Sequence, residues 1–227
     1  MKVRIDPQLC AEHPGVAVRY VLVDGVTVER SPPRLRELLR RVEEQIRAGD
    51  ISEPLLPGVR HNLDAWAAFS RETGAEVPPS PAWLVELVGT GRPVPRTSNV
   101  VDVANLAALC SGLPVAAFDR DEIAGGAVVR QAREGESYVA LFERRPTPLR
   151  PGEIVYADDE GVFSRHAKDS HRTRVRESTT RVLFVVDGCP GVVEGDLDRA
   201  CALLTDTLRD VVPGCEPTSP RPATVAD

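Results

Sequence analysis

The sequence predicts an α+β fold in which mixed β-sheets are layered with helices, and three stretches near the middle of the chain carry this prediction. Residues 99–111 repeat apolar side chains at spacings of three and four, which is the period of a helix with a buried stripe. Residues 113–118 form an apolar run too short for a helix, which predicts a buried strand. The Gly125-Gly126 pair then turns the chain into another apolar run at residues 127–130. A helix that leads into two strands places both kinds of element in one domain.

The N-terminal part of the chain predicts a strand followed by several helices. Residues 16–28 are rich in β-branched residues around an Asp-Gly turn, which predicts an edge strand or a hairpin. Leucines at helical spacing predict the next helix, which Ser31 caps and which ends at Gly49. Shorter helical patches follow around Trp66 and around Trp83.

The C-terminal half predicts further strands, one long helix and a tail. Strands separated by turns are expected at residues 138–142, 153–156, 162–164 and 181–187. Leucines recur on one side of residues 196–212, so this segment is expected to be a helix. Residues 215–227 are polar and contain prolines, so we expect a flexible tail after a single domain that spans residues 1–214.

Composition and charge exclude several classes of protein. The 227 residues carry a net charge of −6, which argues against a protein that coats nucleic acid through bulk electrostatics. No apolar run has the length of a signal peptide or of a membrane span, so we expect a cytoplasmic protein with no membrane partner. The five cysteines show no zinc-ligand spacing, and the sequence has no glycine-rich phosphate loop. We therefore expect no metal and no nucleotide cofactor.

The segment at residues 99–130 also resembles a known family. A helix that carries VVD and an asparagine precedes a GxPxxAFD strand and a GGxVVR strand, which is the order in the B3/4 (tRNA-editing) domain of the phenylalanyl-tRNA synthetase beta subunit. The similarity extends to residues 63–74, 151–162 and 179–188, and so to nearly the whole chain. It implies the fold of that editing domain. Because 227 residues leave no room for the catalytic and anticodon modules of the synthetase, the chain resembles a free-standing member of the family.

The resemblance implies hydrolysis of the ester that joins a wrong amino acid to the terminal ribose of tRNA. A free-standing domain would act in trans, with the 3′ aminoacyl end of tRNA as its partner. Ala116 stands where synthetase domains usually show a histidine, and a residue at about Val185 stands where they show an acidic one. The amino acid is therefore expected to be aromatic or arginine-like, and specificity for tyrosine is no longer implied. The alternative is a module that binds a tRNA end or an amino acid without catalysis.

The stretch at residues 165–181 is the one local concentration of basic residues in this acidic sequence, and it could contact the phosphates of a tRNA. The candidates for tRNA binding in it are Arg165, Lys168, Arg172, Arg174 and Arg176. In the same stretch, His166 and His171 titrate close to neutral pH, so either could activate water. Asp169 could orient water, and Ser170 is a weaker candidate for a nucleophile beside a histidine. The alternative is a solvated loop with surface histidines, in which Asp169 pairs with an arginine.

Candidates for substrate binding lie on the neighbouring elements as well as in this stretch. They are Asp102, Asn105, Ala116, Gly125, Gly126 and Thr173. Asp102 and Asn105 are three residues apart and so share one face of a helix, where the amide can donate and accept towards a substrate. The glycine pair would let a nucleotide approach the backbone closely. The structural alternatives are backbone satisfaction by Asn105 and an ordinary turn at the glycines, and Asn99 is expected to be an N-cap.

Overall fold

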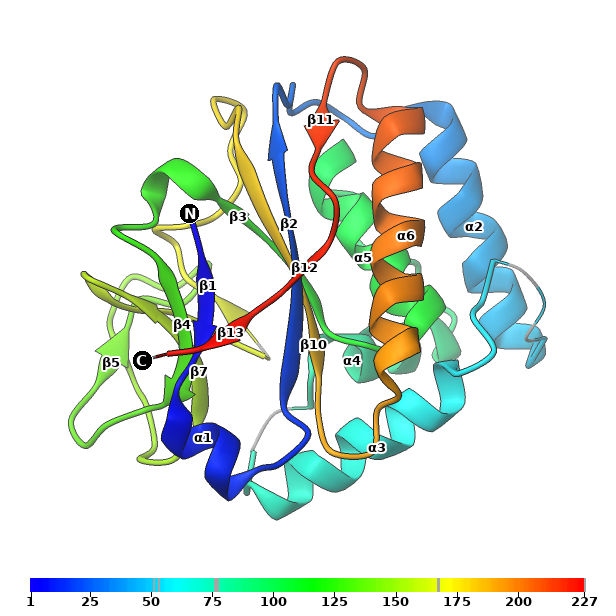
Figure 1. Ribbon diagram of the computed structural model, residues 1–227. Helices are drawn as coiled ribbons and strands as arrows, with labels where there is room; N and C mark the ends of the chain where they lie inside the picture. The colour runs from blue at the N-terminus through cyan, green and yellow to red at the C-terminus, as the bar shows by residue number, and fades with distance from the viewer. Residues whose placement is uncertain (51, 53, 76–77, 167, 227) are drawn as a thin grey trace.

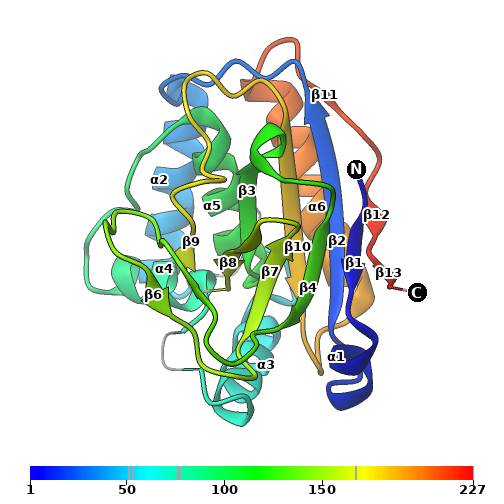
Figure 2. The ribbon, with the colours of Figure 1, turned by 90° about the vertical axis from the view of Figure 1, so that its left-hand side faces the viewer.

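The computed structural model describes residues 1–50, 52, 54–75, 78–166 and 168–226, and the fold has three layers (Figures 1 and 2). Helices cover one face of a central sheet, and a second sheet packs against the other face. Figure 2 looks onto the second sheet, with the central sheet and the helices behind it. The predicted α+β class with mixed sheets is confirmed.

The central sheet is antiparallel and has β10 (Val182–Gly188) in its middle. On one side β10 pairs with β3 (Val115–Asp119), and on the other with β2 (Ala17–Asp24), which in turn pairs with the short β11 (Glu216–Pro217) and β12 (Arg221–Pro222). Every residue of β10 is buried, because helices cover one face of the strand and the second sheet covers the other. This burial explains why residues 181–187 are almost continuously apolar.

The second sheet is mixed and has the strand order β13-β1-β4-β7-β8-β9. These strands are β13 (Thr224–Val225), β1 (Val3–Ile5), β4 (Ala127–Gln131), β7 (Ile154–Asp158), β8 (Gly161–Arg165) and β9 (Lys168–Asp169). The pairs of β1 with β13 and with β4 are parallel, and the others are antiparallel. The predicted strands at 153–156 and 162–164 are confirmed. Of residues 138–142, only Tyr138 lies in a named strand, β5 (Ser137–Tyr138), which pairs with β6 (Thr147–Pro148), because the chain turns at residues 140–143.

The helical layer is built around α5, which is buried along nearly its whole length. Its helices are α2 (Pro33–Ala48), α3 (Val59–Glu72), α4 (Ser80–Gly89), α5 (Asn99–Ser111) and α6 (Glu194–Val211). Helix α5 packs against β3 and against the four other helices. The short α1 (Pro7–Glu12) lies near β4, and a 3₁₀ turn, η1 (Arg120–Glu122), follows β3. The residues of α5 are therefore apolar or small on nearly every side of the helix, and they do not form a single amphipathic stripe.

Two predicted caps are wrong, and both side chains hold other parts of the fold. Helix α2 begins after Pro32, and the Ser31 hydroxyl donates to Oδ2 of Asp102 at 2.6 Å. The N-cap of α5 is Ser98, whose hydroxyl accepts from the Val101 amide. Asn99 instead links α5 to the segment before α2, because its amide donates to the carbonyl of residue 27 and its oxygen accepts from the amide of residue 29. The hairpin considered at residues 16–28 is a single strand, β2.

The C-terminal segment is not a flexible tail in the described residues. It crosses from the helical side over the central sheet to the second sheet (Figure 1). Strands β11 and β12 pair with β2, and β13 extends the second sheet beyond β1. The polar, proline-containing sequence concealed this pairing because edge strands bond through their backbones and tolerate proline. The expectation of a flexible tail is therefore wrong for residues 216–225, whereas the single domain over residues 1–214 stays a prediction.

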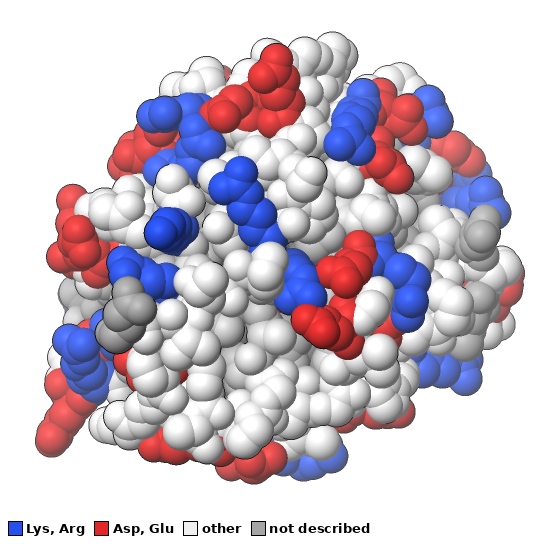
Figure 3. All heavy atoms as spheres, viewed as in Figure 1, with Lys and Arg blue, Asp and Glu red and all other residues white. Residues whose placement is uncertain are grey.

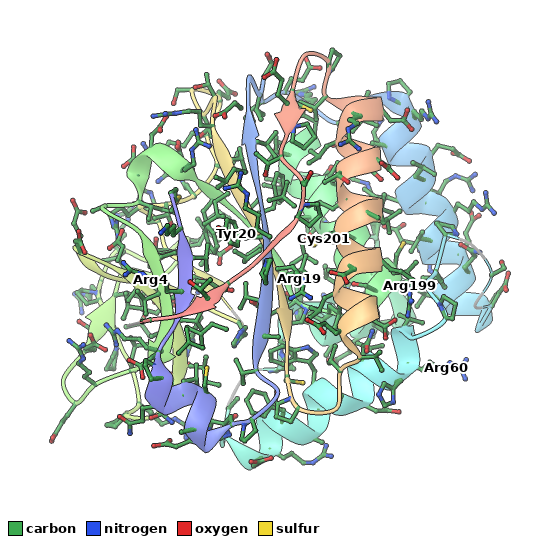
Figure 4. All side chains as sticks on the ribbon, viewed as in Figure 1. Arg4, Arg19, Tyr20, Arg60, Arg199 and Cys201 are labelled. Carbon is green, nitrogen blue, oxygen red and sulfur yellow. The ribbon has the colours of Figure 1, made fainter. Side chains whose placement is uncertain are left out.

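Beside this crossing, Arg19 ties the central sheet to α6 (Figure 4). Arg19 lies on β2 and is 9% exposed. Its guanidinium donates to Glu194 and, at 2.9 Å, to Asp198, both on α6. Because one guanidinium binds two carboxylates of α6, it fixes the position of this helix relative to β2. The two carboxylates also neutralise the largely buried charge of Arg19.

Candidate active site

A cleft of about 430 Å³ opens between the two sheets and the helical layer. One wall comes from β3 and from the first turns of α4 and α5, and the other comes from β7, β8 and β9 with the turn before β6. Most of the lining is apolar, with carboxyl, imidazole, amide and basic groups at a few places. This combination and volume are typical of small-ligand sites.

At the inner end of the cleft, Tyr156 and Asp187 join the two sheets. The Tyr156 hydroxyl on β7 donates to Oδ1 of Asp187 on β10, and both side chains are buried. Burial, and then the charge of Asp187, raise the pKa of the Tyr156 phenol well above its ordinary value. The phenol therefore remains protonated and serves as a fixed donor to the carboxylate.

His166 lies beside the same carboxylate, after the end of β8. Its Nε2 atom is 3.3 Å from Oδ2 of Asp187. Its ring packs between two aromatic residues, with centroid distances of 4.9 Å to Trp66 on α3 and 6.4 Å to Tyr156. A carboxylate beside an imidazole fixes the orientation of the ring.

Asp169, on β9, is a second carboxyl group in the cleft. Its Oδ1 atom accepts a hydrogen bond of 2.7 Å from the Ser164 hydroxyl of β8. Desolvation raises the pKa of Asp169 from its ordinary 3.8 to about 6, with a further increase from the charge of Asp187 and an opposing decrease from Ser164. A carboxyl group with this pKa exchanges its proton near neutral pH, so it is suited to proton transfer.

Asn105 of α5 and Ala116 of β3 also line the cleft. Ala116 lies directly opposite Val185 in the β3–β10 ladder. The two positions at which this sequence departs from the synthetase pattern are thus neighbours on the sheet. Ala116 lines the cleft, whereas Val185 is fully buried beside it, so neither position supplies a polar group to the cleft.

Three other candidates from the basic stretch are not among the residues that line the cleft. Ser170 and Thr173 are buried, and the Ser170 hydroxyl accepts from the Thr173 amide and contacts its hydroxyl at 3.0 Å. These bonds hold a turn, so neither residue enters the site that we propose. His171 is exposed, and its Nδ1 atom lies 2.8 Å from the guanidinium of Arg174.

Asp102, Gly125 and Gly126 also lie outside the cleft lining. Asp102 is fully buried, accepts from Ser31 and accepts from the amide of residue 97 at 2.9 Å, so it joins the starts of α2 and α5. Gly125 has a φ of +72°, and a Cβ there would meet the side chain of Asp159. The glycine pair is a turn against a neighbouring loop.

The basic stretch divides into two groups. Arg165, Lys168 and Arg174 line the cleft, with Arg165 paired to a carboxylate of the loop before β7 at 2.9 Å. Arg172 and Arg176 instead hold the protein together: Arg172 forms a bidentate pair with Asp158 at 2.9 Å, and Arg176 contacts residue 122. Ala167, within this stretch, lies outside the described residues.

On the face shown in Figure 3, Lys and Arg side chains are interspersed with Asp and Glu rather than gathered in one patch. This face therefore offers no continuous basic surface to the backbone of a nucleic acid.

Sequence reasoning missed Asp187, Tyr156 and Ser164. Asp187 ends an otherwise apolar strand, just before a glycine, and there it resembles the start of a turn. An acidic residue inside a buried strand was the signal that could have identified it, because an ionised side chain is rarely buried without a partner. Tyr156 and Ser164 gave no signal of their own, since both fit ordinary strand positions.

Among the described residues, the structure has no helix with the length and apolar character needed to cross a membrane.

Comparisons with known proteins agree with this fold and with the matched motifs. A model of the B3/4 domain matches residues 66–224. The phenylalanine–tRNA ligase beta subunit of Geobacter metallireducens is 30% identical over 180 residues, which are 77% of this chain and 21% of that protein. The corresponding subunit of Anaeromyxobacter dehalogenans is 39% identical over 114 residues, or 49% of this chain and 14% of that protein. The chain thus spans about a fifth or less of the length of these relatives.

A solved structure shows the same fold over almost the whole chain. It is an N-terminal fragment of the phenylalanyl-tRNA synthetase beta subunit from Pyrococcus horikoshii, with a TM-score of 0.53 and 15% sequence identity. The similarity covers 95% of this chain and 50% of that fragment. The family model spans the cleft-lining strands, α5, α6 and the C-terminal segment up to β13, and on this basis the chain belongs to the B3/4 domain family.

Proposed function

We propose that this protein hydrolyses the ester bond of mischarged tRNA in trans, in the cleft between its two sheets. The B3/4 domain is the editing domain of the phenylalanyl-tRNA synthetase beta subunit, and it is associated with hydrolysis of aminoacyl-tRNA. The observation that carries the proposal is the group formed by His166, Asp169 and Asp187 in an otherwise mainly apolar cleft. No metal or nucleotide cofactor enters the proposed reaction.

The chemistry needs few groups because an aminoacyl ester is already activated. A site that holds the terminal ribose and places one water molecule near the ester carbonyl supplies most of the effect through orientation. His166, held beside Asp187 at 3.3 Å, accepts the proton of this water as it attacks. Asp169, with its pKa of about 6, is the second group that can accept a proton at neutral pH. The amide of Asn105 faces the same cleft and can bind the ribose or the amino acid.

The amino acid is aromatic or arginine-like in this proposal. The apolar lining and the small Ala116 favour an aromatic side chain, whereas the two carboxyl groups favour a cationic one. A charged or hydrogen-bonding partner discriminates by several orders of magnitude more than a change in apolar size. An assay on tRNAs that carry aromatic and tRNAs that carry cationic amino acids therefore distinguishes the two classes of substrate.

The test is an assay of ester loss from a panel of misacylated tRNAs, measured against spontaneous hydrolysis. We expect acceleration for at least one member, and a loss of about 100-fold or more in the His166→Gln and Asp187→Asn variants. The matched control is His61→Gln, because His61 is an exposed histidine on α3 that contacts the carbonyl of residue 191. If no member of the panel is hydrolysed but mischarged tRNA still binds, the protein is the non-catalytic module and the proposal fails.

A further inference from the structure

Phe142 is the most exposed large apolar side chain in the described part of the molecule, and it stands at the cleft. Its exposed fraction is 89%, and it contributes to the cleft lining. A fully solvated phenylalanine costs hydration free energy without adding to the core. Trp83, on α4 at the opposite wall, is 46% exposed and lines the same cleft. The cleft therefore carries an exposed aromatic residue on each wall.

The backbone of Phe142 adopts a left-handed conformation, which is strained for a residue with a bulky side chain. Residues 140–143 form a turn closed by a hydrogen bond of 3.0 Å from the Glu143 amide to the Ala140 carbonyl. Phe142 occupies the third position with a φ of +68°, and it is the only non-glycine residue with a positive φ in the ranges that the structure describes. This position of a type II turn favours glycine or asparagine, because a Cβ atom is crowded there. Turn formation alone would thus select a different residue.

The turn is fixed next to the proposed catalytic groups. The Leu141 amide donates to the Asp169 carbonyl at 2.8 Å, and the Tyr138 hydroxyl donates to the carbonyl of Lys168 at 3.0 Å. Glu143 also binds Lys168 across the same gap. Phe142 is therefore held beside β9, one residue along the chain from the contact with Asp169. Local strain that surrounding bonds maintain is typical of a binding site.

We propose that Phe142 and Trp83 hold the terminal adenine of the tRNA between the walls at the mouth of the cleft, an inference that rests on the proposed function. The ester of an aminoacyl-tRNA is attached to the same ribose as this adenine. When the ester lies at His166 and Asp169, the base lies one sugar away, towards the cleft mouth. An aromatic side chain offers every base a stacking surface. Arg174, in the same lining, can meet the adjacent phosphate.

The test compares two RNA hairpins that end in a single-stranded CCA, one intact and one with an abasic terminal nucleotide. Affinities are measured for the wild type and for Phe142→Gly and Phe142→Asn, two replacements that suit the positive φ and so keep the turn. We expect each variant to weaken binding of the intact hairpin by at least about five-fold. We expect no change for the abasic hairpin. Thermal unfolding should show the same or a higher melting temperature for Phe142→Gly.

The matched control is Val193→Ala, since Val193 is 55% exposed at the start of α6 and does not line the cleft. It should leave both affinities unchanged. Equal losses for the intact and abasic hairpins, or no loss for either, would overturn the stacking proposal. Ester hydrolysis is measured on the same variants, so the two proposals fail separately. Deacylation without base-dependent binding refutes only the role of Phe142, and base-dependent binding without deacylation refutes only the hydrolase.

Discussion

At the scale of single residues, the site depends on one carboxyl group that the fold keeps partly protonated. Asp169 is half-buried, accepts from Ser164 and lies within the electrostatic influence of Asp187. Desolvation is the main cause of its raised pKa. The native state therefore holds a proton that the unfolded chain releases at lower pH, and the stability of the protein depends on pH through this group.

The first prediction concerns Asp169→Asn, an isosteric change that mimics the protonated carboxyl. The native pKa is about 6 and the ordinary value is 3.8, so the wild type is destabilised as the pH rises from about 4 to about 6. The variant lacks this effect. As the pH rises over this range, the free energy of unfolding of the variant should increase relative to that of the wild type by up to about 3 kcal/mol. Urea unfolding at a series of pH values measures the difference.

A second variant checks the cause of this dependence. Ser164→Ala removes the hydrogen bond that lowers the pKa of Asp169, so the titration of native Asp169 should move to higher pH. A stability difference between the wild type and Asp169→Asn that stays constant from pH 4 to 7 would show that Asp169 is not desolvated. Activity should rise with pH through about 6 if this carboxylate accepts the proton of water.

Part of the site was predictable from the sequence because of the residue types it uses. His166 and Asp169 were candidates, since few side chains exchange protons near neutral pH and both lie in one short stretch. The residue type does not tell that Arg174 lines the cleft whereas Arg172 forms a structural ion pair. The bidentate partner of Arg172, Asp158, lies 14 residues away at the end of β7, and sequence spacing does not reveal such a pair.

At the scale of elements, α3 is positioned by a close approach to the end of α5. Gly112 follows α5 with a φ of +70°, and a Cβ there would lie 2.4 Å from the Val59 carbonyl at the start of α3. The Asn62 amide of α3 donates to the Ser111 carbonyl at 2.9 Å. Since α3 carries Trp66, which packs on His166, this contact between two helices also supports the cleft.

A matched pair of glycines tests the contact. Gly49 ends α2 with the same φ of +70°, but a Cβ there would meet nothing within 4 Å. Gly49→Ala should cost about 1 kcal/mol for the left-handed backbone alone. Gly112→Ala should cost roughly 2–4 kcal/mol, because the methyl group also displaces α3. Chemical denaturation measures both, and equal costs would show that the two helices do not depend on this approach.

The middle of the chain was predictable at this scale, and its C-terminal end was not. The period of residues 99–111 and the apolar run before Phe118 identified α5 and β3 because their side chains are buried. Strands β11, β12 and β13 are exposed pairs of residues held through backbone hydrogen bonds. Such strands leave no hydrophobic pattern, since their side chains face water.

At the scale of the whole molecule, the C-terminal segment starts beside α6 and connects the two sheets along the β2 edge of the central sheet. Its first two strands cover β2, and its last covers β1 (Figure 1). Both covered strands would otherwise present open edges. Open edges weaken a sheet and pair with other molecules.

Truncation after Cys215 tests this role. We expect the melting temperature to fall by roughly 5 to 10 °C, because several backbone hydrogen bonds are lost. We also expect association that increases with protein concentration, through the open edge of β2. A synthetic peptide of residues 216–227 should reverse both changes. An unaltered melting temperature in the truncated protein would mean that the segment lies on the sheets without stabilising them.

The pairing of β1 with β13 has a consequence for how the chain folds while it is made. Arg4 pairs with Thr224, so about 220 residues separate the two partners. At the usual rates of synthesis the first strand emerges roughly 10 to 45 s before its outer neighbour exists. Its inner neighbour, β4, begins only at Ala127. During this interval β1 has no outer partner, so a chaperone that binds unpaired strands can bind it there.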